Sequence, residues 1–189
     1  MCASPVIQKL ETASSEISPE EWEMRVDLAA CYRLIAHYDM DDLFATHISA
    51  RAPGAEEHFL LNPYGMHFSE ITASSLVKVD LDGNIVQDTE HVINPAGFVI
   101  HSAVHAARHD AKCVMHTHTV AGMAIASMEE GLQPWFQKAM RFYKGVAYHD
   151  FEGVADDLDE RERLVRDLGD KDYLVLRNHG LLVCGPTIG

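Results

Sequence analysis

Three histidines have the types and spacing of a divalent-metal site. His116 and His118 stand two apart in or just after an apolar run. Side chains two apart in a strand point to the same face, so both imidazoles can hold one ion. His179 follows the pair by 61 residues (179 − 118), at the end of another apolar run. Three neutral imidazoles with an open fourth position suit catalytic zinc, and Mn, Fe or Co also fit. Spacing alone leaves open the alternative that these histidines only form hydrogen bonds in a polar turn.

The composition describes one globular domain with a strongly acidic surface. The chain has 189 residues, of which 47% are apolar and 23% charged, ordinary values for a domain with a sizeable core. Acidic residues outnumber basic ones by 29 to 15, which gives a formal net charge of −14. Such a surface repels phosphate backbones and anionic lipids, so we expect neither nucleic acid nor membrane as a partner.

The cysteines and the N-terminus predict a cytoplasmic protein. The four cysteines are scattered, without a CxxC pair or a secreted-protein framework, at Cys2, Cys31, Cys113 and Cys184. We interpret them as reduced thiols, three of them buried. The first residues lack the basic and apolar segments of a signal peptide, and no apolar run is long enough to span a membrane.

The first predicted element is a helix that follows a polar arm. Residues 1–17 have no apolar pattern and are expected to form a flexible N-terminal arm, so the folded domain spans 18–189. Ser18 suits the N-cap, Pro19 the first helical position, and Glu21 would complete a capping box. Apolar residues then recur at intervals of four and three and predict a core-facing stripe of Met24, Leu28, Cys31, Ile35 and Tyr38.

Short strand-like runs alternate with further helices along the rest of the chain. We expect strands at 44–51, 59–62, 76–80, 84–87, 112–117, 173–176 and 181–184, and helices at 95–108, 120–128 and 158–168. Asp82-Gly83 predicts a hairpin turn between two of these strands. Hairpins mixed with helices indicate an α/β sandwich with a central, largely antiparallel sheet flanked by helices. Residues 185–189 look like the lead-in to another helix, so we expect a C-terminal segment to follow.

Six segments, in order along the chain, resemble the class II aldolase/adducin family. The likeness extends from about Trp22 to Gly189, and its segments are Asn62-Pro63-Tyr64-Gly65, Thr72 to Lys78, Ala96-Gly97-Phe98, His116-Thr117-His118, Val146 to Asp150 and Arg177-Asn178-His179-Gly180. In the sugar-phosphate aldolases of this family, the HxH pair and the later histidine hold zinc. The resemblance therefore implies the family's fold, a divalent-metal site at His116, His118 and His179, a small-molecule substrate and a homotetramer.

The substrate-binding positions differ from those of the aldolases. The family's carboxylate, a metal ligand or acid/base, corresponds to Gly97, and its two phosphate-binding serines correspond to Pro95-Ala96. The Gly-Asn pair that also helps to bind phosphate appears as Thr46-His47. These changes remove the obvious base for a retro-aldol step and the hydroxyl donors to phosphate. We therefore expect a substrate that is not held through a phosphate group in the family's usual way. Its expected binding residues are Thr46, His47, Tyr64, Gly65 and Gly97.

Two other side chains are candidates for proton transfer. His101 lies one helical turn after Gly97 (101 − 97 = 4) and is expected to reach the space that the carboxylate vacates, as a fourth ligand or a neutral acid/base. The alternative is that His101, His105 and His109 only line one helix face. Tyr148 offers a phenolic proton donor, and packing at a strand end is its alternative.

Two functions follow from these residues. The first is a metal-dependent lyase-type enzyme for aldol cleavage, decarboxylation or epimerisation of a small hydroxy-carbonyl compound. The second is a non-catalytic assembly module, because the segments around Ser74, Gly97 and Tyr148 are closer to the adducin head than to the aldolases. Retention of all three ligand histidines favours the enzyme. Oxygen chemistry at Fe(II) is less favoured, since the carboxylate of a facial triad is not evident.

Overall fold

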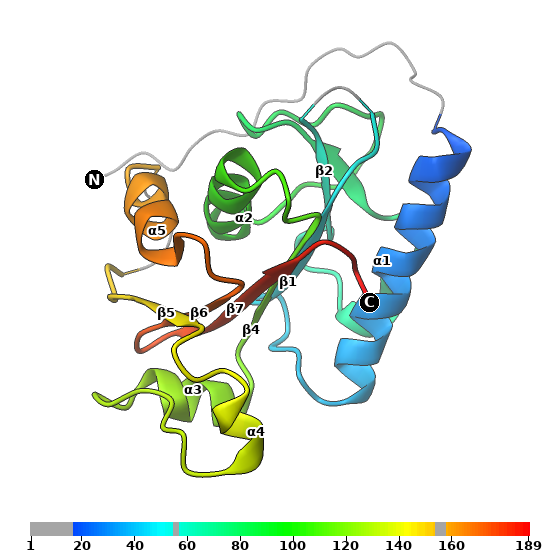
Figure 1. Ribbon diagram of the computed structural model, residues 1–189. Helices are drawn as coiled ribbons and strands as arrows, with labels where there is room; N and C mark the ends of the chain where they lie inside the picture. Colours follow the sequence, from blue (N-terminus) through cyan, green and yellow to red (C-terminus); the bar gives the residue numbers. More distant parts are fainter. Residues whose placement is uncertain (1–16, 55–56, 154–157) are drawn as a thin grey trace.

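A seven-stranded sheet organises the described residues, which are 17–54, 57–153 and 158–189 of the computed structural model (Figure 1). The strands are β1 (His47–Arg51), β2 (Phe59–Leu61), β3 (Val77–Val79), β4 (Cys113–Thr117), β5 (Val146–His149), β6 (Tyr173–Leu176) and β7 (Gly180–Gly185). Their order is β3-β2-β1-β4-β7-β6-β5, and every pair is antiparallel except β5–β6. The predicted α/β fold with a largely antiparallel sheet is confirmed.

Helices cover both faces of the sheet. Helix α1 (Pro19–His37) lies on one face, and α2 (Pro95–Ala107) and α5 (Glu160–Leu168) lie side by side on the other (Figure 1). Two short helices, α3 (Val120–Ala126) and α4 (Gln137–Met140), come between β4 and β5, and a 3-10 turn, η1 (Phe68–Glu70), packs on α1. Within the described ranges no helix is long and apolar enough to cross a membrane.

Strand alternation assigns the side chains of β1 to two layers. Ile48 and Ala50 pack in the layer of α1 with Leu28 and Tyr32. The alternate residues of β1 therefore face α2, and these are polar although the whole strand is buried. A buried polar strand face requires hydrogen-bonding partners, and α2 supplies them from its own polar residues.

Helix α1 begins where predicted, but its buried face differs from the predicted stripe. The Ser18 hydroxyl accepts a hydrogen bond from the Glu21 amide at 3.2 Å, as an N-cap does. The Glu21 carboxylate does not close a capping box, because it is buried against Arg25 and Lys78. Tyr38 is the C-cap and is 67% exposed, so it does not belong to the stripe.

Other element boundaries differ where the sequence pattern was short. Residues 84–87 do not form the predicted strand, although a single antiparallel bridge between Val79 and Ile85 keeps the hairpin turn. Strand β5 and helix α4 were not predicted, because each is only four residues long and β5 pairs with a distant strand through a crossover. The predicted N-terminal arm lies outside the described residues, apart from Ile17.

The buried guanidinium of Arg25 joins α1 to the loop before β3. Its Nε donates to Glu21 at 2.9 Å, and Nη1 donates to the Leu76 carbonyl at 2.8 Å. We expect Arg25→Ala to lower the free energy of unfolding by about 3 kcal/mol, because it leaves a buried carboxylate and carbonyl without this partner. Urea denaturation measures the loss. The control Arg33→Ala removes one hydrogen bond of an exposed arginine and should cost less than about 1 kcal/mol; equal losses would contradict the assignment.

Candidate metal centre

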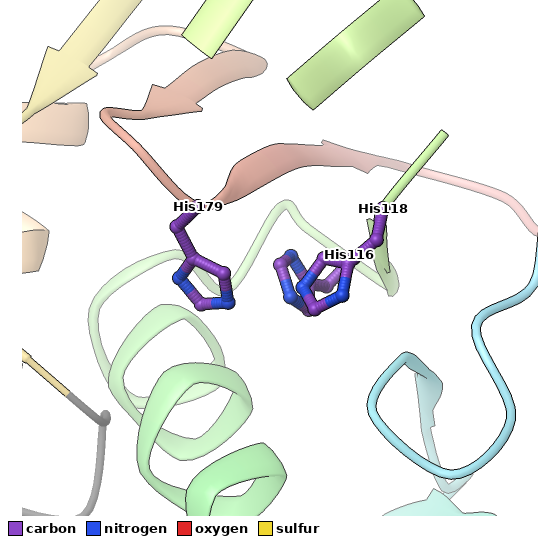
Figure 2. Close-up of side chains that lie close together, drawn as sticks. All are labelled: His116, His118 and His179. Carbon is purple, nitrogen blue, oxygen red and sulfur yellow. The ribbon is translucent and has the colours of Figure 1, made fainter. Parts of the chain in front are cut away.

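Three imidazoles converge where the end of β4 meets the start of the neighbouring strand β7. His116 lies in β4, His118 is the first residue after β4, and His179 is the last residue before β7 (Figure 2). One nitrogen from each ring lies within 4.8 Å of the other two. The ring centroids are 4.6 to 4.9 Å apart. The structure therefore brings together the three residues that the sequence spacing predicted as metal ligands.

Hydrogen bonds behind two of the rings orient them toward the centre. His116 Nδ1 lies 3.0 Å from the Leu181 carbonyl oxygen, and His118 Nδ1 lies 2.9 Å from an Asp42 carboxylate oxygen. Both acceptors require a proton on Nδ1, so Nε2 of each ring carries a lone pair. Each Nε2 is buried without a hydrogen-bond partner among the described residues. A divalent ion satisfies such paired lone pairs, and the hydrogen bonds to Nδ1 are the usual support for histidine ligands.

The turn before β7 brings His179 to the pair. Asn178 has a φ of 54°, and its amide donates to the Ala126 carbonyl at 2.9 Å. Gly180 packs so tightly that a Cβ there would lie 2.6 Å from the Thr117 carbonyl oxygen and 2.8 Å from the His118 ring. The glycine therefore allows β7 to approach the HxH segment closely enough for the third imidazole to join it.

Burial favours the neutral form of two of these imidazoles, His116 and His179. Desolvation, with smaller contributions from the neighbouring imidazoles, holds the pKa of His116 well below its ordinary value. The pKa of His179 is lowered to about 4, again first by burial and then by His118. Neutral imidazole is the form that binds metal, so these two ligands need not lose a proton at pH 7.

The three histidines open onto a pocket of about 370 Å³. Its other lining residues are Phe44, Ala45, His47, Tyr64, Asn94, Ala96, Ile100, Phe151 and Gly153. Among these described residues there is no lysine, arginine, aspartate or glutamate. The described lining therefore combines a possible metal-ligand cluster with apolar walls, and it includes neither a cation for a phosphate nor a carboxylate for proton transfer.

The imidazole of His47 lies over Gly97, the position that corresponds to the family's carboxylate. A Cβ at residue 97 would lie 2.6 Å from His47 Cδ2, closer than van der Waals contact allows. The same ring stacks on His116, with centroids 5.1 Å apart and an interplanar angle of 28°. Gly97 thus makes room for His47, and the two predicted substrate-binding residues form one unit beside the ligands.

His101 lies behind His47 and not on the pocket wall. It is fully buried, and its Nε2 is 3.1 Å from His47 Nδ1. Its Nδ1 contacts the Ser49 hydroxyl, which is also 2.8 Å from His105 Nε2. Both nitrogens of His101 are therefore occupied, and this geometry does not support the prediction that His101 itself acts as a ligand or acid/base. The sequence reasoning missed Ser49, whose only signal was its place two residues after His47 in a strand.

The remaining predicted site residues lie at different distances from the pocket. Tyr64 lines it and packs edge to face on Phe44, with centroids 5.7 Å apart. Gly65 supplies a turn with φ of 84°, and the Thr46 hydroxyl accepts a hydrogen bond from the Asp42 amide, so both shape the surrounding loops. Neither is among the residues that line the pocket.

Tyr148 is not among the residues that line the pocket of the three histidines. Its hydroxyl accepts a hydrogen bond from the Leu132 amide at 3.0 Å, and the Arg177 guanidinium lies 4.7 Å from its ring centre. These contacts place Tyr148 at a separate cavity formed by the α4 region and β5. Within one chain the prediction of a catalytic phenol at this position is therefore not supported, and the alternative of strand-end packing fits.

Comparisons with known proteins agree with this geometry. A family model described as "Class II Aldolase and Adducin N-terminal domain" matches residues 26–189. The crystal structure of an aldolase II superfamily protein from Pseudomonas syringae is 58% identical, with a TM-score of 0.89, over 91% of this chain and 70% of that chain. L-fuculose 1-phosphate aldolase from Glaciozyma antarctica PI12 is 30% identical, with a TM-score of 0.80, over 95% of this chain and 70% of that chain. Alpha-adducin from Rattus norvegicus is 45% identical over 168 residues, which are 87% of this chain and 23% of that protein.

The buried neutral imidazoles predict a loss of stability in acid. The pKa of His105 is lowered to about 3, chiefly by burial, and that of His179 to about 4. In the unfolded chain these histidines take up a proton near pH 6.5, whereas in the folded chain they stay neutral. The free energy of unfolding is therefore highest above pH 6.5 and decreases as the pH falls toward 4. We expect the free energy of unfolding, measured with a chelator present, to fall by up to about 1.4 kcal/mol per pH unit for each such histidine.

A variant at His105, which is not one of the three candidate ligands, tests the origin of the slope of the free energy of unfolding against pH. His105→Gln should reduce by about one the number of protons taken up on unfolding, and this number sets the slope of the free energy of unfolding against pH. The control Ser102→Ala, at a fully buried residue on the same helix, should lower stability without changing the slope. His149, whose pKa is raised first by its hydrogen bond to Glu160, acts with the opposite sign. A wild-type stability that is flat between pH 7 and pH 4 would contradict the assignment.

Proposed function

The chain belongs to the class II aldolase and adducin N-terminal domain family, and on this premise we propose that it is a metal-dependent lyase-type enzyme for a small hydroxy-carbonyl compound. The reaction class is aldol cleavage, decarboxylation or epimerisation. The cofactor is a divalent metal ion, with zinc first and Mn, Fe or Co as alternatives for three imidazole ligands.

One observation carries the proposal. Nε2 of His116 and Nε2 of His118 are buried without partners among the residues that the structure describes, and a nitrogen of His179 lies within 4.8 Å of both ligand nitrogens. Uncompensated buried polar atoms destabilise a fold unless something binds them. Two converging lone pairs, with a third imidazole beside them, therefore support a bound cation better than a purely structural cluster.

Different residues of the chain orient the ligands and line the pocket around the ion. A bound zinc ion supplies Lewis-acid polarisation of a substrate oxygen. His116 Nδ1 donates to the Leu181 carbonyl and His118 Nδ1 donates to the Asp42 carboxylate, and these hydrogen bonds fix the rings so that the open side of the site faces the pocket. Phe44 and Phe151 give the pocket apolar walls, and each of these side chains is itself about half exposed.

The pocket favours a substrate without a phosphate group. Its described lining has no lysine or arginine, and the positions of the phosphate-binding serines are Pro95 and Ala96. The sequence-based expectation of a non-standard aldolase is thereby supported. L-fuculose 1-phosphate aldolase shares the fold at 30% identity, but its named substrate class does not suit this lining.

A non-catalytic assembly module is the second candidate. The likeness to alpha-adducin reaches 45% identity, and no carboxylate lines the pocket among the described residues. A module of this kind does not require a metal ion, so metal content separates the two candidates.

The first prediction of the enzyme proposal concerns metal content. Protein purified without a metal-affinity tag should contain about one equivalent of zinc or a similar metal per chain. The double variant His116→Ala, His118→Ala should bind at least about 100-fold more weakly, because even changes to supporting residues cost 10- to 100-fold. Elemental analysis and competition with a chromogenic chelator give both numbers.

The matched control removes two exposed histidines, His37→Ala and His109→Ala, and should keep the metal. A wild type without metal, even after supply of zinc or manganese, would remove the enzyme proposal and leave the assembly module. With metal present, unphosphorylated hydroxy-acids and keto-acids are the compounds to screen for turnover.

We also propose a homotetramer in the cytoplasm. Large apolar side chains are exposed around α3 and α4, where a contact with another subunit would cover them: Val120, Trp135, Phe136, Met140 and Tyr143. The described cysteines are free, which suits a reducing compartment: Cys31, Cys113 and Cys184. Light scattering after size-exclusion chromatography should give four times the chain mass, and Trp135→Glu should reduce it; a monomeric wild type would contradict the tetramer.

A further inference from the structure

The third candidate ligand differs from the other two in its surroundings. His116 and His118 each have an acceptor behind the ring, the Leu181 carbonyl and the Asp42 carboxylate. The ring of His179 has no hydrogen bond to a residue that the structure describes. A neutral imidazole that binds an ion through one nitrogen carries its proton on the other nitrogen, and this N–H normally has an acceptor. Metal binding would therefore leave His179 with a donor that lacks a partner from the described residues.

The outer nitrogen of His179 lies on the side away from the other two ligands. Figure 2 shows one nitrogen of His179 on the side of the other two rings and the second nitrogen on the far side. His179 also lines a second, small cavity of about 10 Å³. This cavity adjoins the pocket of the metal centre, because both are lined by Ile100, Phe151, Gly153 and His179. The ring of His179 therefore lies between two spaces.

The Glu160 carboxylate lines the same small cavity. Glu160 is the first residue of α5 and is only 6% exposed. Its Oε1 lies 3.3 Å from His149 Nε2, whereas its Oε2 has no hydrogen bond to another described residue. A carboxylate can accept about four hydrogen bonds, so Glu160 has acceptor capacity left. The cavity thus has a donor, His179, and an acceptor, Glu160, in its lining.

Two neighbours hold the Glu160 carboxylate in place. His149 is the last residue of β5 and is 3% exposed. Its Nε2 contacts Glu160, and its Nδ1 lies 2.8 Å from Asp167 Oδ2. Asp167 follows Glu160 by seven residues (167 − 160), which is about two turns of α5. One buried imidazole therefore ties both ends of this helix to the end of β5, and a fixed carboxylate is what the support of a ligand requires.

The size of the cavity determines how Glu160 and His179 can meet. A volume of about 10 Å³ is room for one water molecule. An ordered water needs two to four polar partners, and His149, Glu160 and His179 provide them. A bridging water is nearly as favourable in enthalpy as a direct hydrogen bond. Burial and then His118 lower the pKa of His179, and Glu160 acts in the opposite direction, as a nearby carboxylate does.

We propose that Glu160, through one bridging water molecule, accepts the hydrogen bond of the outer N–H of His179 and so orients this third imidazole toward the ion. The proposal rests on the proposed function, because it concerns the same metal centre. Glu160 is a positioning residue that does not contact the ion, and no proton is transferred. Each of the three ligands then has an acceptor behind its ring, and two of these acceptors, Asp42 and Glu160, are carboxylates, which increase the basicity of the ligand.

The first measurement is the zinc affinity of Glu160→Gln, by competition with a chromogenic chelator. The amide keeps the shape of the side chain but removes its charge and one acceptor oxygen. Zinc should bind about 10- to 100-fold more weakly, the usual loss for a residue that supports a ligand. The matched control Glu162→Gln removes the same charge from an exposed position of α5 and should change the affinity by less than about twofold.

The second measurement repeats Glu160→Gln in a His179→Ala chain, which keeps two of the three ligands. If Glu160 acts through His179, the substitution should now change the zinc affinity by less than about twofold, because the two residues are coupled. A loss of the same size with and without His179 would overturn the inference, since it would come from the fold or from overall charge. Equal affinities of the wild type and Glu160→Gln would also overturn it and leave the proposed function intact. A wild type that binds no zinc would reject both.

A crystal structure of the zinc-bound wild type tests the water directly and does not depend on the folding of a variant. We expect one ordered water within hydrogen-bonding distance of both the outer nitrogen of His179 and the Glu160 carboxylate. If that nitrogen instead contacts another group, or bulk solvent without Glu160, the inference is wrong.

Discussion

The need to keep buried imidazoles neutral and hydrogen-bonded constrains this molecule more than any other interaction. Four histidines between the sheet and α2 are at most 3% exposed: His47, His101, His105 and His116. Burial lowers the pKa of each, so the fold contains them as uncharged donors and acceptors. Each needs a partner in a defined direction. The polar face of β1, the Ser49 hydroxyl and the Leu181 carbonyl supply these partners, and their directions determine which lone pairs are left for the pocket.

At the position where the family resemblance implies a carboxylate, this pocket has the imidazole of His47 above Gly97. Gly97 has no side chain, and His47 fills the space above it. A carboxylate beside three neutral imidazoles would add a negative charge to the metal site, whereas His47 adds only a dipole. The two positions are 50 residues apart in sequence (97 − 47) and in direct contact in the fold. The imidazole at position 47 fits only because position 97 has no side chain.

The same geometry explains how one fold can resemble both an aldolase and an adducin. The similarity to L-fuculose 1-phosphate aldolase and to alpha-adducin covers most of this chain. Fold similarity does not decide chemistry, which depends on the groups in the site. Here the ligand triad has the arrangement of a metal enzyme, while the phosphate-binding and acidic groups are replaced. The described lining of the site therefore suits a metal ion better than a phosphate group.

The sequence by itself determined the local features whose physics is local. Period-two and helical patterns predicted most strands and helices, and the HxH spacing placed His116 and His118 on one strand face. The place of His179 at the end of an apolar run made it the candidate third ligand, and the family likeness then favoured metal binding over hydrogen bonding in a polar turn. Short elements such as β5 were missed, because four residues carry little pattern and their pairing comes from a distant strand.

Only the tertiary structure decided which other histidines serve the pocket. His101 and His105 follow helical spacing, which predicts a shared helix face but not what lies against it. The packing of α2 on β1 puts His47 at the pocket and His101 behind it, and it brings in Ser49, which had no distinguishing sequence signal. Within one chain, the contacts of Tyr148 also differ from the prediction, because its hydroxyl accepts a hydrogen bond from the Leu132 amide. The sequence gives residue type and spacing. The hydrogen-bond partners of each imidazole come from segments that only folding brings together.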